Sequence, residues 1–181
     1  MPATALLVVD MLNPYDHEDA DKLAESVRER LPRIVELRDR AQESDDVLLV
    51  YANDNYERWE ATRDDLVADA VAGEHPDLVQ PIVPPRDVPF LPKGRHSAFY
   101  ETPLSHLLHT EEVERLVICG QVTEQCVFYT ALDAFLRGYE VVIPTDAVAH
   151  FVPGFAEAAL GMMRDNLHAE VRDGREVVLP G

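Results

Sequence analysis

The sequence predicts an α/β fold in which a mostly parallel sheet of about six strands is covered by helices on both faces. Apolar runs that are hydrophobic almost throughout alternate with amphipathic stretches. Such runs are typical of parallel strands that are buried on both faces, and the alternation favours right-handed β-α-β crossovers. The chain has 181 residues without a Gly/Ser-rich linker or an internal repeat. We therefore expect a single domain over residues 1–181.

Three strands and two helices are expected in the N-terminal half. The strands are residues 5–10, 47–54 and 88–92. Apolar residues at helical spacing predict a long helix over residues 19–43, in which Pro32 predicts a kink or a break because proline lacks the N–H group that a helix interior uses. A second helix is expected to end near residue 72, before a proline-rich segment.

The C-terminal half continues the alternation of strand and helix. The helix over residues 123–138 is closed by Gly138, since glycine readily takes the backbone conformation that ends a helix. In chain order, the expected elements are a short helix within 102–113, a strand at 115–120, the helix over 123–138, a strand within 139–147, a helix at 155–168 and a last strand within 169–179.

Charge and composition exclude several classes of protein. With 34 acidic and 16 basic residues the formal charge is -18, which repels phosphate backbones and anionic lipids, so neither nucleic acid nor a membrane is an expected partner. No stretch approaches the roughly 18 apolar residues of a membrane span, and the N-terminus lacks the pattern of a signal peptide. Two cysteines are too few for a disulfide framework. A cytoplasmic protein is expected.

Three chemically active residues follow predicted strands. Asp10 ends the first strand, Lys93 follows the third, and Cys126 lies just past the fourth at the start of a helix. Because reactive groups of parallel α/β sheets collect beyond the carboxyl ends of the strands, we expect these three side chains to meet. A thiol, a proton acceptor and an ammonium together are suited to nucleophilic catalysis on a small-molecule substrate.

The helix start beside Cys126 adds two expectations. The helix dipole and the Lys93 ammonium are expected to lower the pKa of the thiol from its usual value of about 8.5. Free backbone N–H groups, here those of Thr123 and Cys126, are expected to form an oxyanion hole. Acyl transfer is the reaction class that uses both features.

Each residue also has an ordinary structural explanation. An aspartate at a strand end often caps a turn, a lysine in a loop is usually solvated, and a lone cysteine often behaves as a small buried hydrophobe. Their joint placement at three strand ends favours function. Two alternatives remain open: a non-catalytic small-molecule-binding or scaffold protein, and a thiol redox sensor.

Three segments together resemble the isochorismatase-like cysteine hydrolases, a superfamily that includes nicotinamidases and N-carbamoylsarcosine amidohydrolases. They are LLVVDMLNPY, LPKGRHSAFYETPLSHLL and RLVICGQVTEQCVFYTALDAFLRGYEVVIPTDAVA. The resemblance runs from about residue 5 to 172. It rests most on the patterns K-x-R-x-S-A-F and G-x-x-T-x-x-C-V, which begin at Lys93 and Gly120.

The resemblance implies a three-layer, Rossmann-like α/β/α fold with an Asp10-Lys93-Cys126 catalytic triad. It implies a cis peptide at Val122–Thr123 that turns the amides of Thr123 and Cys126 toward a substrate carbonyl. Cys126 would attack the carbonyl, Asp10 would shuttle the proton, an amine or ammonia would leave, and water would hydrolyse the thioester. Family members commonly form dimers or tetramers, so a homo-oligomer is expected.

Departures from the family pattern narrow the range of expected substrates and cofactors. Isochorismatases proper lack the nucleophilic cysteine, so Cys126 favours the amidase side. Nicotinamidases carry an Asp-x-His metal-binding stretch where residues 53–56 read Asn-Asp-Asn-Tyr, so no metal and no other cofactor are expected.

Four aromatic residues are the expected lining of the substrate pocket: Tyr15, Tyr56, Trp59 and Phe99. Aromatic side chains can stack on a planar substrate, but Tyr56 and Trp59 could equally pack a lid or a subunit interface, and Phe99 could belong to the core. His96, close to Lys93 in the sequence, either lines the entrance of the site or caps local backbone.

Overall fold

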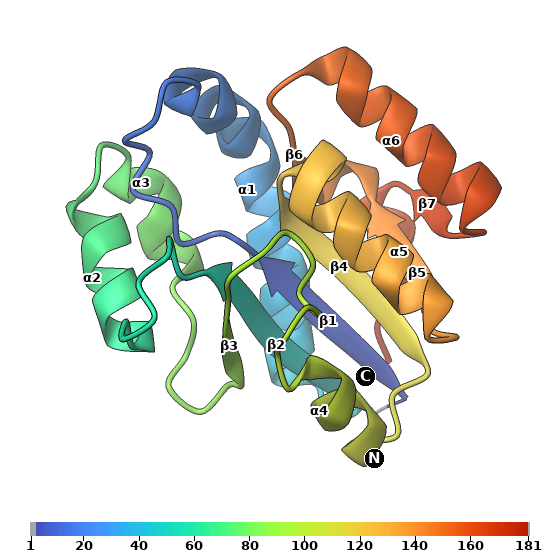
Figure 1. Ribbon diagram of the computed structural model, residues 1–181. Coiled ribbons are helices and arrows are strands. Elements are labelled where there is room, and N and C mark those ends of the chain that lie inside the picture. The colour runs from blue at the N-terminus through green and yellow to red at the C-terminus, as the bar shows by residue number, and fades with distance from the viewer. Residues whose placement is uncertain (1–2, 181) are drawn as a thin grey trace.

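The structure, a computed structural model, describes residues 3–180 and contains one parallel sheet of seven strands (Figure 1). Six strands follow the order β3-β2-β1-β4-β5-β7, and β6 pairs with β4. The strands are β1 Thr4–Val9, β2 Val47–Asp54, β3 Phe90–Lys93, β4 Arg115–Gln121, β5 Glu140–Pro144, β6 Val148–Ala149 and β7 Glu170–Arg172.

Helices connect successive strands and cover both faces of the sheet. The α-helices are α1 Ala20–Glu43, α2 Arg63–Ala72, α3 Pro76–Val79, α4 Leu104–Thr110, α5 Phe128–Leu136 and α6 Pro153–Asn166. A π-helical turn, η2 Thr123–Val127, precedes α5. Three 3-10 turns complete the elements: η1 Gln80–Ile82, η3 Thr145–Ala147 and η4 Gly174–Glu176.

Side chains of β1 show how the two apolar layers form. Leu6 and Val8 belong to a core that includes residues of α1, α2 and α3, whereas Leu7 and Val9 belong to a second core with residues of α4, α5 and α6. Successive strand residues point to opposite faces, so a strand that is apolar throughout supplies both cores. Figure 1 shows α4, α5 and α6 on one side of the sheet and α1 on the other. The α/β/α prediction is confirmed, with seven strands instead of about six.

Two local expectations are corrected. The helix α1 runs through Pro32 without a break, because the buried side chains of Leu31 and Ile34 on either side pack against the sheet and hold the helix in place. The helix expected over residues 123–138 begins as the π-helical turn η2, and the short strand β6 was not expected.

Strand order determines which residues can meet at the carboxyl edge of the sheet. The ends of β3, β2, β1 and β4 lie next to one another. Asp54 of β2 is in register with Lys93 of β3, and the backbone N–H of Asp10 donates to Ala52 O at 2.9 Å. Residues that follow β1 and β3 are therefore neighbours across the end of β2, and residues that follow β4 lie beside those that follow β1.

Within residues 3–180, none of the helices combines the length and the apolar composition that crossing a lipid bilayer requires.

Candidate active site

The side chains of Asp10, Lys93 and Cys126 meet at the carboxyl edge of the sheet. Lys93 Nζ lies 2.8 Å from Asp10 Oδ2 and 3.5 Å from Cys126 Sγ. Asp10 directly follows β1, Lys93 ends β3, and Cys126 lies in η2 after β4. The ammonium thus lies between the carboxylate and the sulfur, as the positions of the three strand ends predict.

The Lys93 side chain is completely buried. Besides its two partners in the cluster, Nζ donates to the backbone oxygen of Arg95 at 3.1 Å and lies 3.9 Å from Asp54 Oδ2. A buried ammonium is costly unless it is paired and hydrogen-bonded, and these contacts provide that compensation. They also fix the position of Nζ beside the sulfur.

Backbone contacts fix Asp10. Its φ of 54° is in the left-handed region, which aspartate and asparagine tolerate better than most residues. Oδ1 accepts a hydrogen bond from the Asp54 N–H at 2.6 Å, and Gln121 Nε2 donates to the Asp10 carbonyl at 2.5 Å. The carboxylate is therefore held between Lys93 and the end of β2.

A cis peptide precedes the turn that carries Cys126, but it lies between Gln121 and Val122 and not at Val122–Thr123 as the resemblance implies. The correction agrees with the local structure: β4 ends at Gln121 and η2 begins at Thr123, so the cis bond joins the strand to the one residue between them. The Val122 carbonyl accepts from two N–H groups of η2, and Thr123 Oγ1 donates to Ala149 O at 2.8 Å.

Burial and the charges of the neighbouring groups together shift the pKa values of the three side chains. Burial raises the pKa of the Cys126 thiol, and the Asp10 carboxylate raises it further, against the opposing effect of Lys93. Burial also raises the pKa of Asp10, and the Lys93 ammonium opposes this. For Lys93, burial lowers the pKa, but Asp10 outweighs it with help from Cys126 and Asp54, so the net shift is upward.

The expectation of a lowered thiol pKa is therefore wrong. The turn holds Cys126 with only 7% of its surface exposed, and desolvation of a thiolate there outweighs the nearby ammonium. The raised pKa of Cys126 keeps its thiol protonated at neutral pH. A carboxylate whose pKa is raised is also a better proton acceptor for that thiol.

His96 contacts the sulfur from another side. Its Nδ1 lies 3.5 Å from Cys126 Sγ, its ring stacks on Tyr129 at 5.5 Å, and the residue is exposed. The sequence left its role open between the entrance and a backbone cap, and the contact favours the entrance. In the sequence, only the closeness of His96 to Lys93 pointed to a place at the site. No local pattern shows which way the side chain of an exposed loop residue points.

Two of the four expected pocket residues lie near the site's outer surface. The Tyr56 hydroxyl donates to Leu12 O at 2.7 Å, and burial of this hydroxyl, followed by the charges of Asp10 and Asp54, raises its pKa well above the usual value. Trp59 is 75% exposed and lines a cavity of 350 Å³ that also includes Gly94, next to Lys93. Their contact with a substrate remains a prediction.

Tyr15 and Phe99, the other two expected pocket residues, are both buried among apolar side chains, and their contact with a substrate also remains a prediction. Tyr15 is fully buried and contacts His75 edge-on at 5.4 Å. Phe99 is 4% exposed, with the Arg137 guanidinium 4.8 Å above its ring. An aromatic residue next to a catalytic motif can face either the cavity or the sheet, and the sequence does not distinguish the two directions.

The segment at residues 53–56 does not fit a metal. The Asn53 amide is engaged with Leu12, since Oδ1 accepts from its N–H at 2.8 Å and Nδ2 donates to its carbonyl at 3.1 Å. Asp54 Oδ1 accepts from the Tyr56 N–H at 2.7 Å. In the part of the chain that the structure describes, no group of three or more His, Cys, Asp or Glu residues could hold a metal ion.

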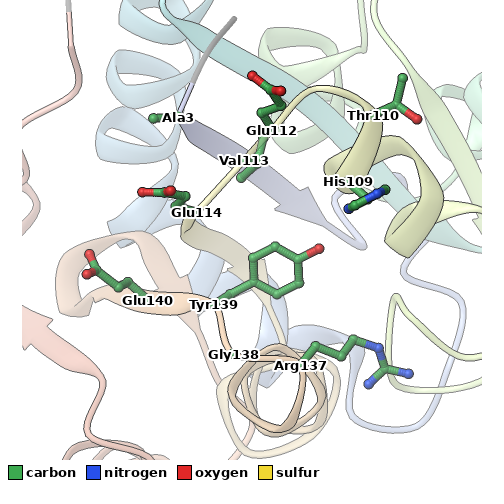
Figure 2. Close-up of a pocket in the computed structure, with 10 residues that line it drawn as sticks. All are labelled: Ala3, His109, Thr110, Glu112, Val113, Glu114, Arg137, Gly138, Tyr139 and Glu140. Atoms are coloured by element: carbon green, nitrogen blue, oxygen red, sulfur yellow. The ribbon is translucent and has the colours of Figure 1, made fainter.

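A wide cavity lies where the strands begin, at the opposite end of the sheet from the three clustered side chains (Figure 2). It measures 1070 Å³ and lies where Glu114 precedes β4 and Glu140 begins β5, with Arg137 and Tyr139 from the end of α5 and the following loop. Cys126 lies beyond the carboxyl ends of these strands, so this cavity belongs to the other end of the molecule. It contains none of the three clustered side chains.

Comparison with known proteins shows which sequences and folds this chain resembles. A profile of the isochorismatase domain matches residues 4–176. The isochorismatase family protein YaaI of Bacillus subtilis (strain 168) is 33% identical over 174 residues, which cover 96% of each chain.

Two solved structures have similar folds. A nicotinamidase from Bacillus subtilis is 26% identical with a TM-score of 0.73, and the match covers 94% of this chain and 99% of that one. An N-carbamoylsarcosine amidase from Thermoplasma acidophilum is 25% identical with a TM-score of 0.66, and the match covers 98% and 99%.

Proposed function

Because this chain belongs to the isochorismatase family, we propose that it is a cysteine hydrolase that cleaves a C–N bond of a small amide-like molecule. The observation that supports the proposal most is the buried contact of one ammonium with both a carboxylate and a thiol. Similarity to a nicotinamidase and to an N-carbamoylsarcosine amidase supports the amide class of substrate. Asp10, Lys93 and Cys126 are the proposed catalytic residues.

Acylation begins with proton transfer from Cys126 to Asp10. The sulfur attacks the carbonyl carbon, Asp10 passes the proton to the leaving nitrogen, and the C–N bond breaks to give a thioester and an amine or ammonia. Lys93 keeps its positive charge throughout, since its pKa is raised. It stabilises the thiolate during attack and the carboxylate before and after it.

The negative charge that develops on the carbonyl oxygen needs donors. We propose the backbone N–H groups of Thr123 and Cys126, at the start of η2, as the oxyanion hole. Loss of one such donor typically costs about 3 kcal/mol of transition-state stabilisation. Thr123 is fully buried and its hydroxyl is bonded to Ala149 O, which supports a rigid position for its amide.

A screen of small amides for ammonia release tests this proposal. The wild type should release ammonia from at least one amide, and Cys126→Ala should lose that activity. Cys119→Ala is the matched control, because Cys119 is fully buried in β4, away from the cluster, and burial raises its pKa to about 12. A Cys126→Ala variant that keeps full activity would overturn the proposal.

The thiol redox sensor is the weaker alternative. Sensor cysteines are usually exposed and have a low pKa, whereas Cys126 is buried with a raised pKa. A non-catalytic binding or scaffold protein would show no turnover of any amide and no acylated cysteine, so the same screen tests it.

We also propose that the protein is a cytoplasmic homo-oligomer, a dimer or a tetramer. Both cysteines are free, which supports a reducing compartment. Large apolar side chains on the outer faces of α5 and α6, Leu136, Phe155 and Met162, are at least 47% exposed and support association. Light scattering after size-exclusion chromatography measures the mass, and a monomer at all concentrations would contradict association.

A further inference from the structure

We propose that His96 is the general base that activates water for hydrolysis of the Cys126 thioester. The inference rests on the proposed function and divides the two half-reactions between two residues. Asp10 takes the thiol proton during acylation, and His96 takes a proton from water during deacylation. Nothing in the family resemblance assigns a role to this histidine.

Position favours His96 over Asp10 and Lys93 for this step. Its Nδ1 is 3.5 Å from Sγ, the same distance as Lys93 Nζ, so it lies next to the atom that carries the acyl group. Asp10 and Lys93 are buried, whereas His96 is exposed. Water that arrives from solvent therefore meets the imidazole at the open side of the sulfur.

The ring of His96 is held in place from two directions. It stacks on Tyr129 of α5 with centroids 5.5 Å apart and an interplanar angle of 15°. The backbone that follows it is fastened to the same helix: Ser97 Oγ donates to Asp133 Oδ2 at 2.5 Å, and the Ala98 N–H donates to Thr130 Oγ1 at 3.0 Å. Because η2 runs directly into α5, one rigid element positions both the sulfur and the histidine.

The carboxylate of Asp10 is less available after acylation. Its Oδ2 is paired with Lys93 at 2.8 Å and its Oδ1 accepts from the Asp54 N–H at 2.6 Å. The Asp10 side chain is only 10% exposed. A thiol delivers its proton to this carboxylate from within the cluster, but water would have to pass the sulfur to reach it.

The proposed step balances without another reactant. Neutral His96, protonated at Nε2, accepts a proton from water at Nδ1 while the water oxygen bonds to the acyl carbon. The C–S bond then breaks, the imidazolium returns the proton to Sγ, and the carboxylic acid leaves. Products are the acid and the free thiol.

p-Nitrophenyl acetate separates the two half-reactions, because its leaving group needs no proton from the enzyme. We expect His96→Phe, which keeps a ring on Tyr129, to release the first equivalent of nitrophenolate at a rate within about threefold of the wild type. Its steady-state rate should fall roughly 100-fold, the lower end of general-base contributions. Intact mass spectrometry should show one acetyl group accumulating on the protein.

Rescue of turnover by hydroxylamine distinguishes a general base at His96 from a residue that only maintains the structure. Hydroxylamine attacks thioesters without a general base, so it should restore turnover of His96→Phe much more than it accelerates the wild type. His106→Gln, an exposed histidine on α4, is the matched control and should behave as the wild type.

Two results would overturn the inference. If His96→Phe keeps the wild-type steady-state rate, His96 is not the base. If burst and steady state fall together and hydroxylamine restores nothing, His96 only positions the thiol. Release of nitrophenolate without any acetyl group on Cys126 in both the wild type and His96→Phe would instead refute the proposed function itself, and the inference would fall with it.

Discussion

Replacement of Asp10 by Asn should make Cys126 more reactive toward alkylation while abolishing hydrolysis. The Asp10 carboxylate raises the pKa of the thiol, so its removal should lower that pKa. Asn keeps the size of the side chain and tolerates the φ of 54° at this position. The same change removes the proposed proton carrier for the leaving amine.

The magnitude follows from two distances. Asp10 Oδ2 is 2.8 Å from Lys93 Nζ, which is 3.5 Å from Sγ, so the carboxylate oxygen and the sulfur are at most about 6 Å apart. At an effective dielectric constant of about 20, two charges at this distance repel by about 3 kcal/mol, or roughly two pKa units. The thiolate fraction at neutral pH should rise by about 100-fold. Because a less basic thiolate is also less nucleophilic, the alkylation rate should rise by about tenfold.

Iodoacetamide labelling, followed by peptide mass spectrometry over a range of pH, measures this rate at Cys126 and at Cys119 separately. The pH midpoint for Cys126 should move down by about two units in Asp10→Asn, and that of Cys119 should not change. Circular dichroism checks that the variant is folded. Slower labelling of Cys126 in the folded variant, or retained amide hydrolysis, would refute the electrostatic reasoning.

Three further substitutions test other parts of the structure. Lys93→Met should abolish turnover and lower the free energy of unfolding by about 3–5 kcal/mol, because it leaves the buried Asp10 carboxylate without its partner; denaturant titration measures this, and an unchanged midpoint would contradict it. Trp59→Ala should raise KM with little change in kcat or stability, since the side chain is 75% exposed. If the variant and the wild type have the same KM, Trp59 does not line the substrate pocket. Phe99→Ala should lower the free energy of unfolding by about 3–5 kcal/mol through the cavity that it leaves. At a temperature where the variant is folded, a KM equal to that of the wild type would show that Phe99 acts through packing, and a raised KM would show that it lines the pocket.

Much of the fold and the central cluster could be predicted from the sequence because they depend on local patterns. Apolar runs identify parallel strands, and the carboxyl ends of those strands share one edge, so residues after β1, β3 and β4 had to be near one another. The structure brings together Asp10, Lys93 and Cys126 as expected.

Features that depend on side-chain direction or burial could not be predicted. A helix start lowers the pKa of a solvated thiol, but Cys126 is buried by residues that are distant in the sequence. Tyr15 and Phe99 turned into the core, and the contact between His96 and Cys126 joins residues 30 positions apart. No periodicity in the sequence encodes such a contact.

Cys126 as the residue that carries the acyl group is the central claim, and mapping that group tests it most directly. The enzyme is quenched with acid during turnover of the amide found in the screen, digested, and analysed by peptide mass spectrometry. We predict a hydroxylamine-sensitive acyl group on the peptide that contains Cys126, and none on that peptide in Cys126→Ala. An acyl group on another residue, or product formation without any acylated peptide in His96→Phe and the wild type alike, would contradict the account.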